Sequence, residues 1–315
     1  MEADLGLLLT GFLAATVRIS TPLLFAATGE MLNERGGVIN LGIEGAMLAG
    51  ALASAIGAAA HGPWAGVLLA VMAGVAVAGL FSLVAIGAGA DQIITGTAVT
   101  LAAVGLTGTI YRTAFGPGGP GLTLPTLPAV GIPGLRAIPV LGQALFSQPV
   151  LTYLAWVLVP ISFWFLFRTW WGLALRAGGE SSEAARASGV PVERIQMLAT
   201  LVGGAMAGLA GATLVLAQVG TFAEKMTAGR GFIAIAIVVL GRRHPVGVLL
   251  AALLFGAATA LQFVFQAMGL ALPYQLFLVL PYALALVALA FAARARLTAP
   301  RAPLTASRID ASARR

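Results

Sequence analysis

Long apolar stretches, each close to 20 residues, recur along almost the whole of this 315-residue sequence. An α-helix of about 20 residues crosses the roughly 30 Å hydrocarbon core of a bilayer. Hydrophobic residues make up 59% of the chain and charged residues only 9%, so a water-soluble fold would expose far too much apolar surface. The sequence therefore predicts an all-α polytopic membrane protein with about eight to ten transmembrane helices. The predicted spans cover roughly residues 5–27, 38–60, 63–89, 92–110, 150–167, 197–219, 245–268 and 274–293.

Arginine placement predicts which connections face the cytoplasm, because cytoplasmic loops of membrane proteins are enriched in basic residues. The loop 168–196, the turn 242–243 and the tail after Arg294 hold most of the arginines. The Gly- and Pro-rich connection 111–149 holds two and is expected outside, irregular and folded back over the spans. An even number of crossings must then separate the loop 168–196 from the tail. The short apolar stretch 231–240 therefore has to complete a crossing, and the N-terminus is expected outside.

This arrangement predicts a multi-pass protein of the cytoplasmic membrane with one transmembrane domain, residues 1–293. Residues 294–315 lose the apolar pattern and gain Pro, Ser and Arg. Such a composition cannot bury enough apolar surface to fold, so a disordered cytoplasmic tail is expected there.

Several kinds of chemistry lack the residues that they require. The chain has no cysteine, its two histidines, His61 and His244, lie far apart, and no phosphate-binding G-x-x-x-x-G-K-[ST] motif is present. No metal site, cofactor or catalytic activity is therefore expected, and any ATP has to be bound by another chain. The formal charge of +7 lies mostly in loops and the tail, which argues against nucleic-acid binding.

Two polar residues stand out at the start of the second predicted span. The stretch 28–45 passes through Gly36-Gly37 and then places Asn40 and Glu44 four residues apart, on one face if the segment is helical. An ionisable side chain inside a span is costly and usually faces a bundle interior or a water-filled path. Glu44 either lines a solute pathway or fastens two helices by pairing with an Arg or a backbone amide.

A short helix is predicted inside the loop 168–196. Ser181 or Ser182 can cap its N-terminus, Glu183 suits its first turn and Arg186 its last, and Gly189 ends it. A small, exposed helix of this kind can dock into a groove on a partner protein. The alternative is an ordinary solvated loop helix.

Neutral polar residues and one glycine-rich segment complete the candidate pathway. Gly229-Arg230-Gly231 precedes the short stretch 231–240 and predicts a broken helix whose free N-terminal amides could face a solute. Neutral donors and acceptors suit a sugar or nucleobase, although hydrogen bonding between helices is the alternative for each one. The predicted pathway residues are Asn40, Glu44, Gln92, Thr95, Thr100, Gln218 and Gln262.

The segments 29–45, 176–189 and 229–234 together resemble the permease family of branched-chain amino acid and simple-sugar ABC importers. Their sequences are most similar to those of the nucleoside-uptake branch, and the resemblance covers roughly residues 20–290. It implies a type II importer permease fold and ATP-driven import of nucleosides. It also implies three partners: a second related permease, ABC ATPase subunits, and an extracytoplasmic substrate-binding protein or lipoprotein.

The resemblance further implies that the loop 168–196 is the coupling loop, through which the ATPase moves the spans. The residues implied to contact the ATPase are Gly179, Glu180, Ser181, Ser182, Glu183, Ala184, Ala185, Arg186 and Gly189.

Two departures from the family pattern leave the solute open. Ser181-Ser182 stands where the family often has Asn-Pro, and Thr100 stands where nucleoside members often carry Asn. A simple sugar or a branched-chain amino acid is therefore the alternative solute for the same machinery. A secondary transporter is less favoured because the spans hold few ion-coupling groups, and an intramembrane enzyme because no acid–base constellation is present.

Overall fold

The computed structural model describes residues 2–116 and 123–267, together with residues 279, 283 and 287. The predicted span 274–293 falls almost entirely outside this part of the chain, and the predicted tail 294–315 falls wholly outside it.

Seven helices in the described residues are long and apolar enough to cross a membrane. They correspond to the first seven predicted spans, so the prediction of a multi-pass helical membrane protein is confirmed. Two of them, α3 and α9, end in π-helical turns, at Leu83–Gly87 and Leu214–Val219. The seven are α1 Glu2–Arg35, α2 Ile43–His61, α3 Pro63–Ser82, α4 Gln92–Phe115, α6 Val150–Arg168, α9 Val192–Thr213 and α11 Pro245–Ala267.

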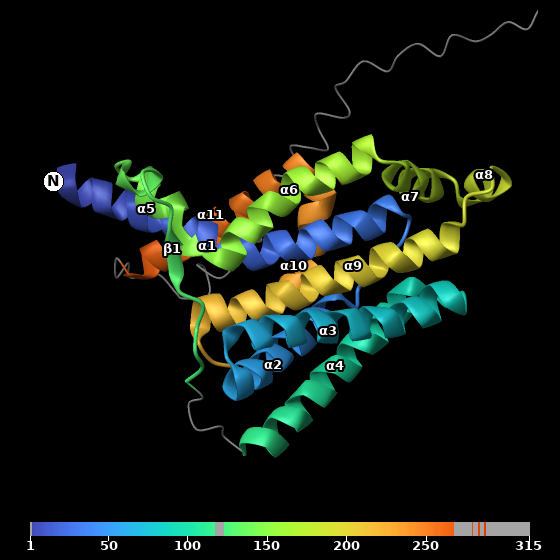
Figure 1. Ribbon diagram of the computed structural model, residues 1–315, viewed down its shortest axis with the longest axis horizontal. Coiled ribbons are helices and arrows are strands. Elements are labelled where there is room, and N and C mark those ends of the chain that lie inside the picture. Colours follow the sequence, from blue (N-terminus) through green and yellow to red (C-terminus); the bar gives the residue numbers. More distant parts are fainter. Residues whose placement is uncertain (1, 117–122, 268–278, 280–282, 284–286, 288–315) are drawn as a thin grey trace, which may run out of the picture.

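Helix α1 runs through the middle of the bundle and packs against α9, α10 and α11 (Figure 1). It extends to Arg35, eight residues past the predicted end at 27, because Glu30 and Asn33 bond to each other one turn apart inside the protein. Close contacts between helices depend on small residues: Gly50 of α2 and Gly74 of α3 both pack against Gly208 of α9. Such residues let helix backbones approach closely in the absence of a hydrophobic driving force between spans.

The two ends of the bundle carry different structures. At one end, the predicted connection begins only after α4 ends at Phe115, and it forms a short antiparallel pair, β1 Ala129–Gly131 and β2 Ser147–Pro149, and helix α5 Leu141–Phe146. Leu124 N–H donates to the Gly220 carbonyl at 2.9 Å and so holds this connection against the end of α9. The predicted folding back over the spans is confirmed, but the segment contains regular elements where irregular structure was predicted.

The opposite end of the bundle carries two further helices, α7 Trp170–Glu180 and α8 Ser182–Ala187 (Figure 1). The predicted single short helix is therefore only half of this region. Gly179 and Glu180 belong to the last turn of α7, whereas Ser181 caps α8 by accepting a bond from Ala184 N–H at 3.3 Å.

The stretch 220–240 crosses from one end of the bundle to the other. Gln218, just before it, donates to the Arg18 carbonyl in the first half of α1, and Arg243, just after it, bonds to Glu34 near the end of α1. Sixteen helical residues separate those two points on α1, a distance of about 24 Å. Only α10, Arg230–Leu240, is helical in this crossing. The other half is a loop in which Phe222 and Thr227 are buried and Glu224 and Lys225 are exposed.

Candidate functional site

The carboxylate of Glu44 sits at the N-terminus of the half-length helix α10. Its Oε1 accepts from Thr227 Oγ1 at 2.6 Å and from Gly229 N–H at 2.9 Å, and its Oε2 accepts from Gly231 N–H at 2.6 Å. The first amides of a helix have no partner within the helix and carry partial positive charge, so a carboxylate is well suited to this place. The broken helix is confirmed, but two of its amides are occupied by Glu44 and are not free to face a solute.

The contact between Glu44 and α10 lies near the middle of the membrane-spanning region. From there to the α7–α8 end, α10 extends over 11 residues, or about 16 Å. On the other side, the neighbouring Gly45 packs against Thr100, eight residues into α4 and so about 12 Å from the same end. Both estimates are close to half of a hydrocarbon core of about 30 Å. We call the contacts of Glu44 with Thr227, Gly229 and Gly231 the midplane junction.

Asn40 does not share a helical face with Glu44, because α2 begins only at Ile43. Its side-chain Oδ1 accepts from Gly42 N–H at 2.9 Å, and its own N–H donates to Glu30 Oε1 at 2.8 Å. These bonds hold residues 38–42 in a non-helical turn that enters the bundle from the α7–α8 end. The predicted helical pairing of Asn40 and Glu44 is therefore wrong, since Asn40 supports the turn that leads into α2.

Three predicted pathway residues lie along α4 beside this turn. Gln92 Oε1 accepts from Ile39 N–H at 2.9 Å, and Thr100 Oγ1 donates to the Leu41 carbonyl at 3.0 Å. Thr95 is buried between them, on the same helix. Asn40, Glu44 and these three residues therefore form one polar region between α2, α4 and α10.

The other two predicted pathway residues are not part of this region. Gln218 belongs to the last turn of the α9 segment and donates to the backbone of Arg18 at 2.6 Å. Gln262 is buried in α11, which packs against α1.

A second set of contacts fastens α10 at its other end. Arg243 Nε donates to Glu34 Oε2 at 2.7 Å, and Arg35 Nε donates to the Arg243 carbonyl at 2.6 Å. Arg242 and Arg243 both have positive φ, 57° and 53°, which strains non-glycine residues. We call the Glu34, Arg35 and Arg243 contacts the end clamp.

The predicted coupling region touches the turn that precedes Asn40. Gly179 of α7 packs directly on Gly37, and Gln196 Nε2 donates to the Gly36 carbonyl at 2.8 Å. Gly37 has φ +82°, a conformation that favours glycine. Movement of α7 would therefore act on a segment that leads, within seven residues, to Glu44.

Seven of the nine residues predicted to contact the ATPase are exposed, at the end of α7, on α8 and in the residues that flank α8. Glu183, Ala184 and Arg186 are exposed, and Ala185 packs inward. Arg186 already has a partner within the chain, since it forms an ion pair with Glu193 at 2.6 Å.

At the β-strand end, the loop 220–229 carries an ion pair and an aromatic cluster. Arg112 of α4 binds Glu224 through two bonds of 2.8 Å, and these bonds lower the pKa of the Glu224 carboxyl below its ordinary value. The rings of Tyr111 and Phe222 lie 5.0 Å apart, and those of Tyr111 and Phe115 lie 5.5 Å apart. This end of α4 thus presents flat apolar rings next to a charged pair.

Sequence reasoning missed Glu30, Thr227 and the end clamp. Glu30 is fully buried, and it belongs to the same stretch as Asn40 and Glu44. An acidic residue three positions before an Asn near the end of a span was the signal for it. Thr227, two residues before Gly229, carried no comparable signal, because its role depends on a residue 183 positions away.

Known proteins resemble this chain over most of its length. TsgC13 of Haloferax volcanii, provisionally named as a glucose ABC transporter permease, is 41% identical over 83% of this chain and 80% of its own. The guanosine ABC transporter permease NupQ of Bacillus subtilis is 35% identical over 91% of this chain and 93% of its own. The nucleoside ABC transporter permease NupC of Lactococcus lactis is 34% identical over 77% of this chain and 78% of its own. No solved structure gives a significant match.

The family profile described as the permease component of branched-chain amino acid transport systems matches residues 12–289. This match includes the midplane junction, the end clamp and both helices of the predicted coupling loop. The resemblance inferred from three short segments thus extends over nearly all of the predicted transmembrane domain. The chain belongs to the family of permease components of branched-chain amino acid transport systems.

Proposed function

We propose that this chain is the permease subunit of an ATP-driven importer that carries nucleosides across the cytoplasmic membrane. The choice of solute rests on one observation: the carboxylate of Glu44 is bound by groups of the protein itself. This carboxylate accepts three bonds inside the protein, so the polar region around it offers neutral groups to a solute. A zwitterionic amino acid would require fixed charges of both signs, whereas a nucleoside or sugar requires neutral donors and acceptors.

The aromatic cluster at the other end of α4 supports a nucleoside over a simple sugar. Tyr111 and Phe115 are partly exposed beside the loop 220–229, and a nucleobase can stack on such rings. The guanosine and nucleoside permeases among the relatives support the same choice. The relative named for glucose keeps a simple sugar as the second candidate.

In this proposal the solute path runs along α4, past Thr100, Thr95 and Gln92, beside the midplane junction. A second permease closes the path, ABC ATPase subunits bind at α8, and an extracytoplasmic binding protein delivers the solute. Gln218 and Gln262 remain proposed pathway residues at some remove from this group. ATP-driven movement at α8 reaches the path through the contact of Gly179 with Gly37.

The test is uptake into vesicles that contain the chain with the ATPase, permease and binding protein encoded beside it. We expect ATP-dependent uptake of labelled guanosine, adenosine or uridine, with little competition by glucose or ribose. Uptake of glucose or ribose alone would show that the solute is a sugar and not a nucleoside, and would leave the proposed ATP-driven mechanism unchanged. Uptake driven by an ion gradient without the ATPase would overturn the mechanism.

A further inference from the structure

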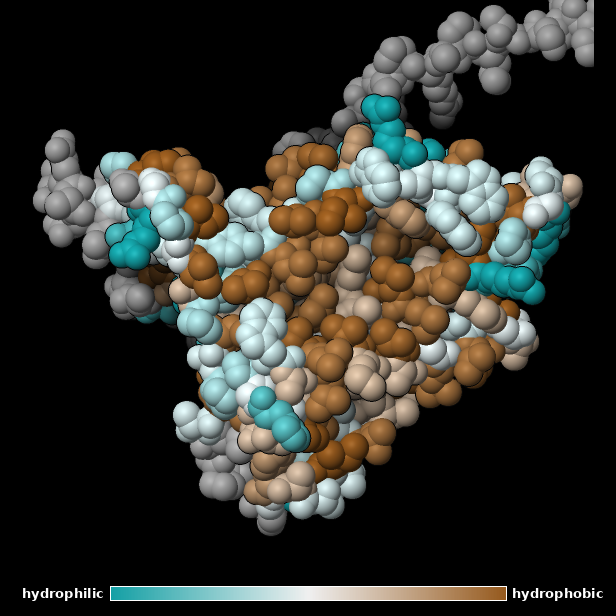
Figure 2. Space-filling model, in the orientation of Figure 1, coloured by the Kyte–Doolittle hydropathy of each residue, from teal (hydrophilic) through white to brown (hydrophobic). Residues whose placement is uncertain are grey.

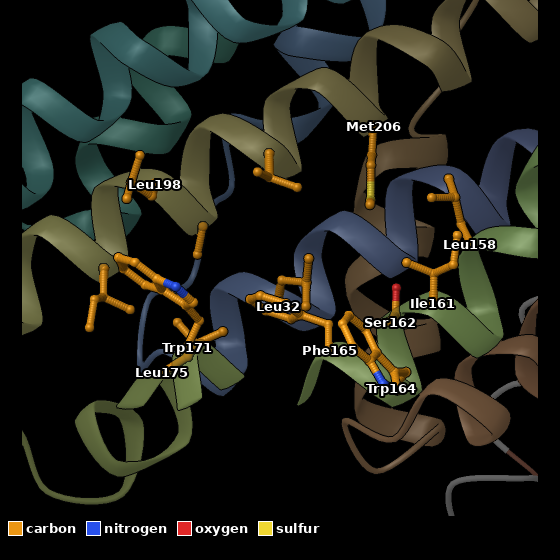
Figure 3. Close-up of a pocket in the computed structure, with 13 residues that line it drawn as sticks. Leu32, Leu158, Ile161, Ser162, Trp164, Phe165, Trp171, Leu175, Leu198 and Met206 are labelled. Atoms are coloured by element: carbon orange, nitrogen blue, oxygen red, sulfur yellow. The ribbon is translucent and has the colours of Figure 1, made fainter. Parts of the chain in front are cut away.

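An apolar groove of about 590 Å³ opens between α6 and α9, on a face that holds none of the polar pathway residues. Its floor is formed by Leu32 of α1, and its α7 end is closed by Trp171 and Leu175 (Figure 3). Apart from the indole N–H groups of Trp164 and Trp171, Ser162 has the only polar side-chain atom among the residues that line it. A nucleoside would leave its hydroxyls and ring nitrogens without partners there, so the groove suits a hydrocarbon ligand.

The rim of the groove faces outward. Trp164 on α6 is 61% exposed, and Leu198 and Val202 on α9 are 52% and 45% exposed. Hydrophobic side chains cover the middle of this face, between hydrophilic ends (Figure 2). In a membrane this pattern places the groove at the depth of the acyl chains.

The second permease is the obvious rival occupant. To enclose a shared solute path it has to cover the polar region between α2, α4 and α10. None of the residues that line the groove comes from those three helices. A partner placed over the path therefore leaves the groove open to lipid.

Positive charge marks one end of the groove. Arg168 lies one turn beyond Trp164 on α6, and Arg194 lies one turn before Leu198 on α9, so both are at the α7 end of its rim. Both arginines are exposed, and within the described part of the chain neither has an ion-pair partner. Trp170 and Trp171, 59% and 52% exposed, lie at the same end. Exposed Trp and Arg together are typical of the membrane–water interface, where lipid headgroups lie.

We propose that this groove binds an anionic phospholipid, with an acyl chain between α6 and α9 and the phosphate at Arg168 and Arg194. The apolar lining accepts the chain, and the two guanidinium groups select the charged headgroup. The lipid belongs to the leaflet on the α7–α8 side, and its headgroup lies next to the coupling loop. Binding there depends on the groove and its arginines and on no particular transported solute.

The test measures lipids that stay bound to the purified complex, by native mass spectrometry after delipidation and addition of dioleoylphosphatidylglycerol or dioleoylphosphatidylcholine. We expect phosphatidylglycerol to be retained over phosphatidylcholine. The double variant Arg168→Gln/Arg194→Gln should lower that retention by about tenfold, and each single variant by less. Arg242→Gln removes a charge on the same side of the membrane but away from the groove, and should leave retention unchanged.

Two further variants test the apolar half of the site. Ala199→Phe fills the groove without changing charge, and should also lower the retention of phosphatidylglycerol. Because the chain has no cysteine, Trp164→Cys gives one reactive thiol on the rim. We expect added phosphatidylglycerol to slow its reaction with a maleimide.

Three outcomes would overturn the proposal. Equal retention of both lipids, or retention unchanged in the double variant and both single variants, would show that the two arginines do not form a headgroup site. Retention unchanged in Ala199→Phe would show that the acyl chain does not bind in the groove. Protection of the Trp164→Cys thiol in the delipidated complex would mean that protein fills the groove, either the second permease or the chain's own residues 274–293.

Discussion

The two ends of α10 are each held by a glutamate, but through different kinds of partner. At the midplane junction, the buried carboxylate of Glu44 binds two backbone amides and one hydroxyl. At the end clamp, Glu34 binds the side chain of Arg243, which is 55% exposed. Backbone amides cannot rotate away, and no water replaces a lost partner in a buried site, whereas an exposed guanidinium can turn to solvent. The midplane end of α10 is therefore the more firmly positioned of the two.

Removal of the Glu44 carboxylate should have the largest effect. Glu44→Ala leaves two amides and a hydroxyl without partners, which costs about 3 kcal/mol or more of unfolding free energy. Glu44→Gln keeps the size but places an NH₂ group against those donors, so it should also abolish most uptake. Thermal unfolding in detergent and vesicle uptake are the measurements.

Hydrogen exchange tests the cause of that effect. In Glu44→Gln the amides of Gly229 and Gly231 should exchange faster, whereas Glu224→Gln, in the same loop region, should leave them unchanged. Normal uptake and unchanged exchange in Glu44→Gln would show that the junction does not position α10.

A methyl group at Gly231 should have the next largest effect. Its Cβ would lie 2.6 Å from Glu44 Cα and 2.8 Å from Glu44 Oε2, so the two helices would have to separate. Such overpacking costs about 2 kcal/mol, more than the roughly 1 kcal/mol that Ala gains over Gly in a helix. Loss of thermal stability in Gly231→Ala checks this, with Gly105→Ala as control, because a Cβ at Gly105 meets no atom within 4 Å. Equal behaviour of the two variants would argue against tight contact.

The end clamp should tolerate substitution better. Glu34→Gln weakens an ion pair whose Arg243 side chain is already half in solvent, so the expected loss is about 1 kcal/mol. Glu34→Gln should loosen α10 at the α7–α8 end of the bundle, so we expect less transport per ATP hydrolysed. The loss of stability should be smaller than in Glu44→Gln. Thermal unfolding and the ratio of uptake to ATP hydrolysis measure the two effects. If Glu34→Gln proved more damaging than Glu44→Gln, the ranking of the two ends would be reversed.

The pair between Arg112 and Glu224 should have the smallest effect, visible in its pH dependence. The bonds to Arg112 lower the folded-state pKa of Glu224, so the pair stabilises the protein above the ordinary Glu pKa of about 4.3. This stabilisation is lost as the pH falls through the lowered pKa. Wild type should therefore melt slightly higher than Glu224→Gln at pH 7, and the difference should disappear in acid. A difference that grew toward low pH would contradict the assigned cause.

The spans and the broken helix could be predicted because they depend on local sequence. The length of the apolar stretches predicted α1 to α4, α6, α9 and α11, and the glycines around Arg230 indicated where α10 begins. Ser181 or Ser182 was predicted as the cap of the short helix before Glu183, and in the structure Ser181 has that role.

The partners of Glu44 could not be predicted, because they depend on contacts between distant segments. The carboxylate was recognised as unusual, but whether it faced a pathway, an Arg or a backbone amide depends on residues more than 180 positions away. Asn40 was misplaced for a related reason. The apolar run from Val38 looked helical, yet Glu30 and Gly42 take up its hydrogen bonds and delay α2 until Ile43.

The half-helical crossing 220–240 also constrains how this protein enters the membrane. Helix α10 spans only about 16 Å, and the loop before it brings polar backbone to the middle of the bilayer. We expect that this segment does not insert as an independent span, because Glu44 of α2 holds the start of α10 and Glu34 and Arg35 of α1 hold Arg243, just after its end. We expect topology reporters fused after Leu240 to reach their final side only when α1 and α2 are present. On this expectation, insertion of the crossing depends on helices that are made almost two hundred residues earlier.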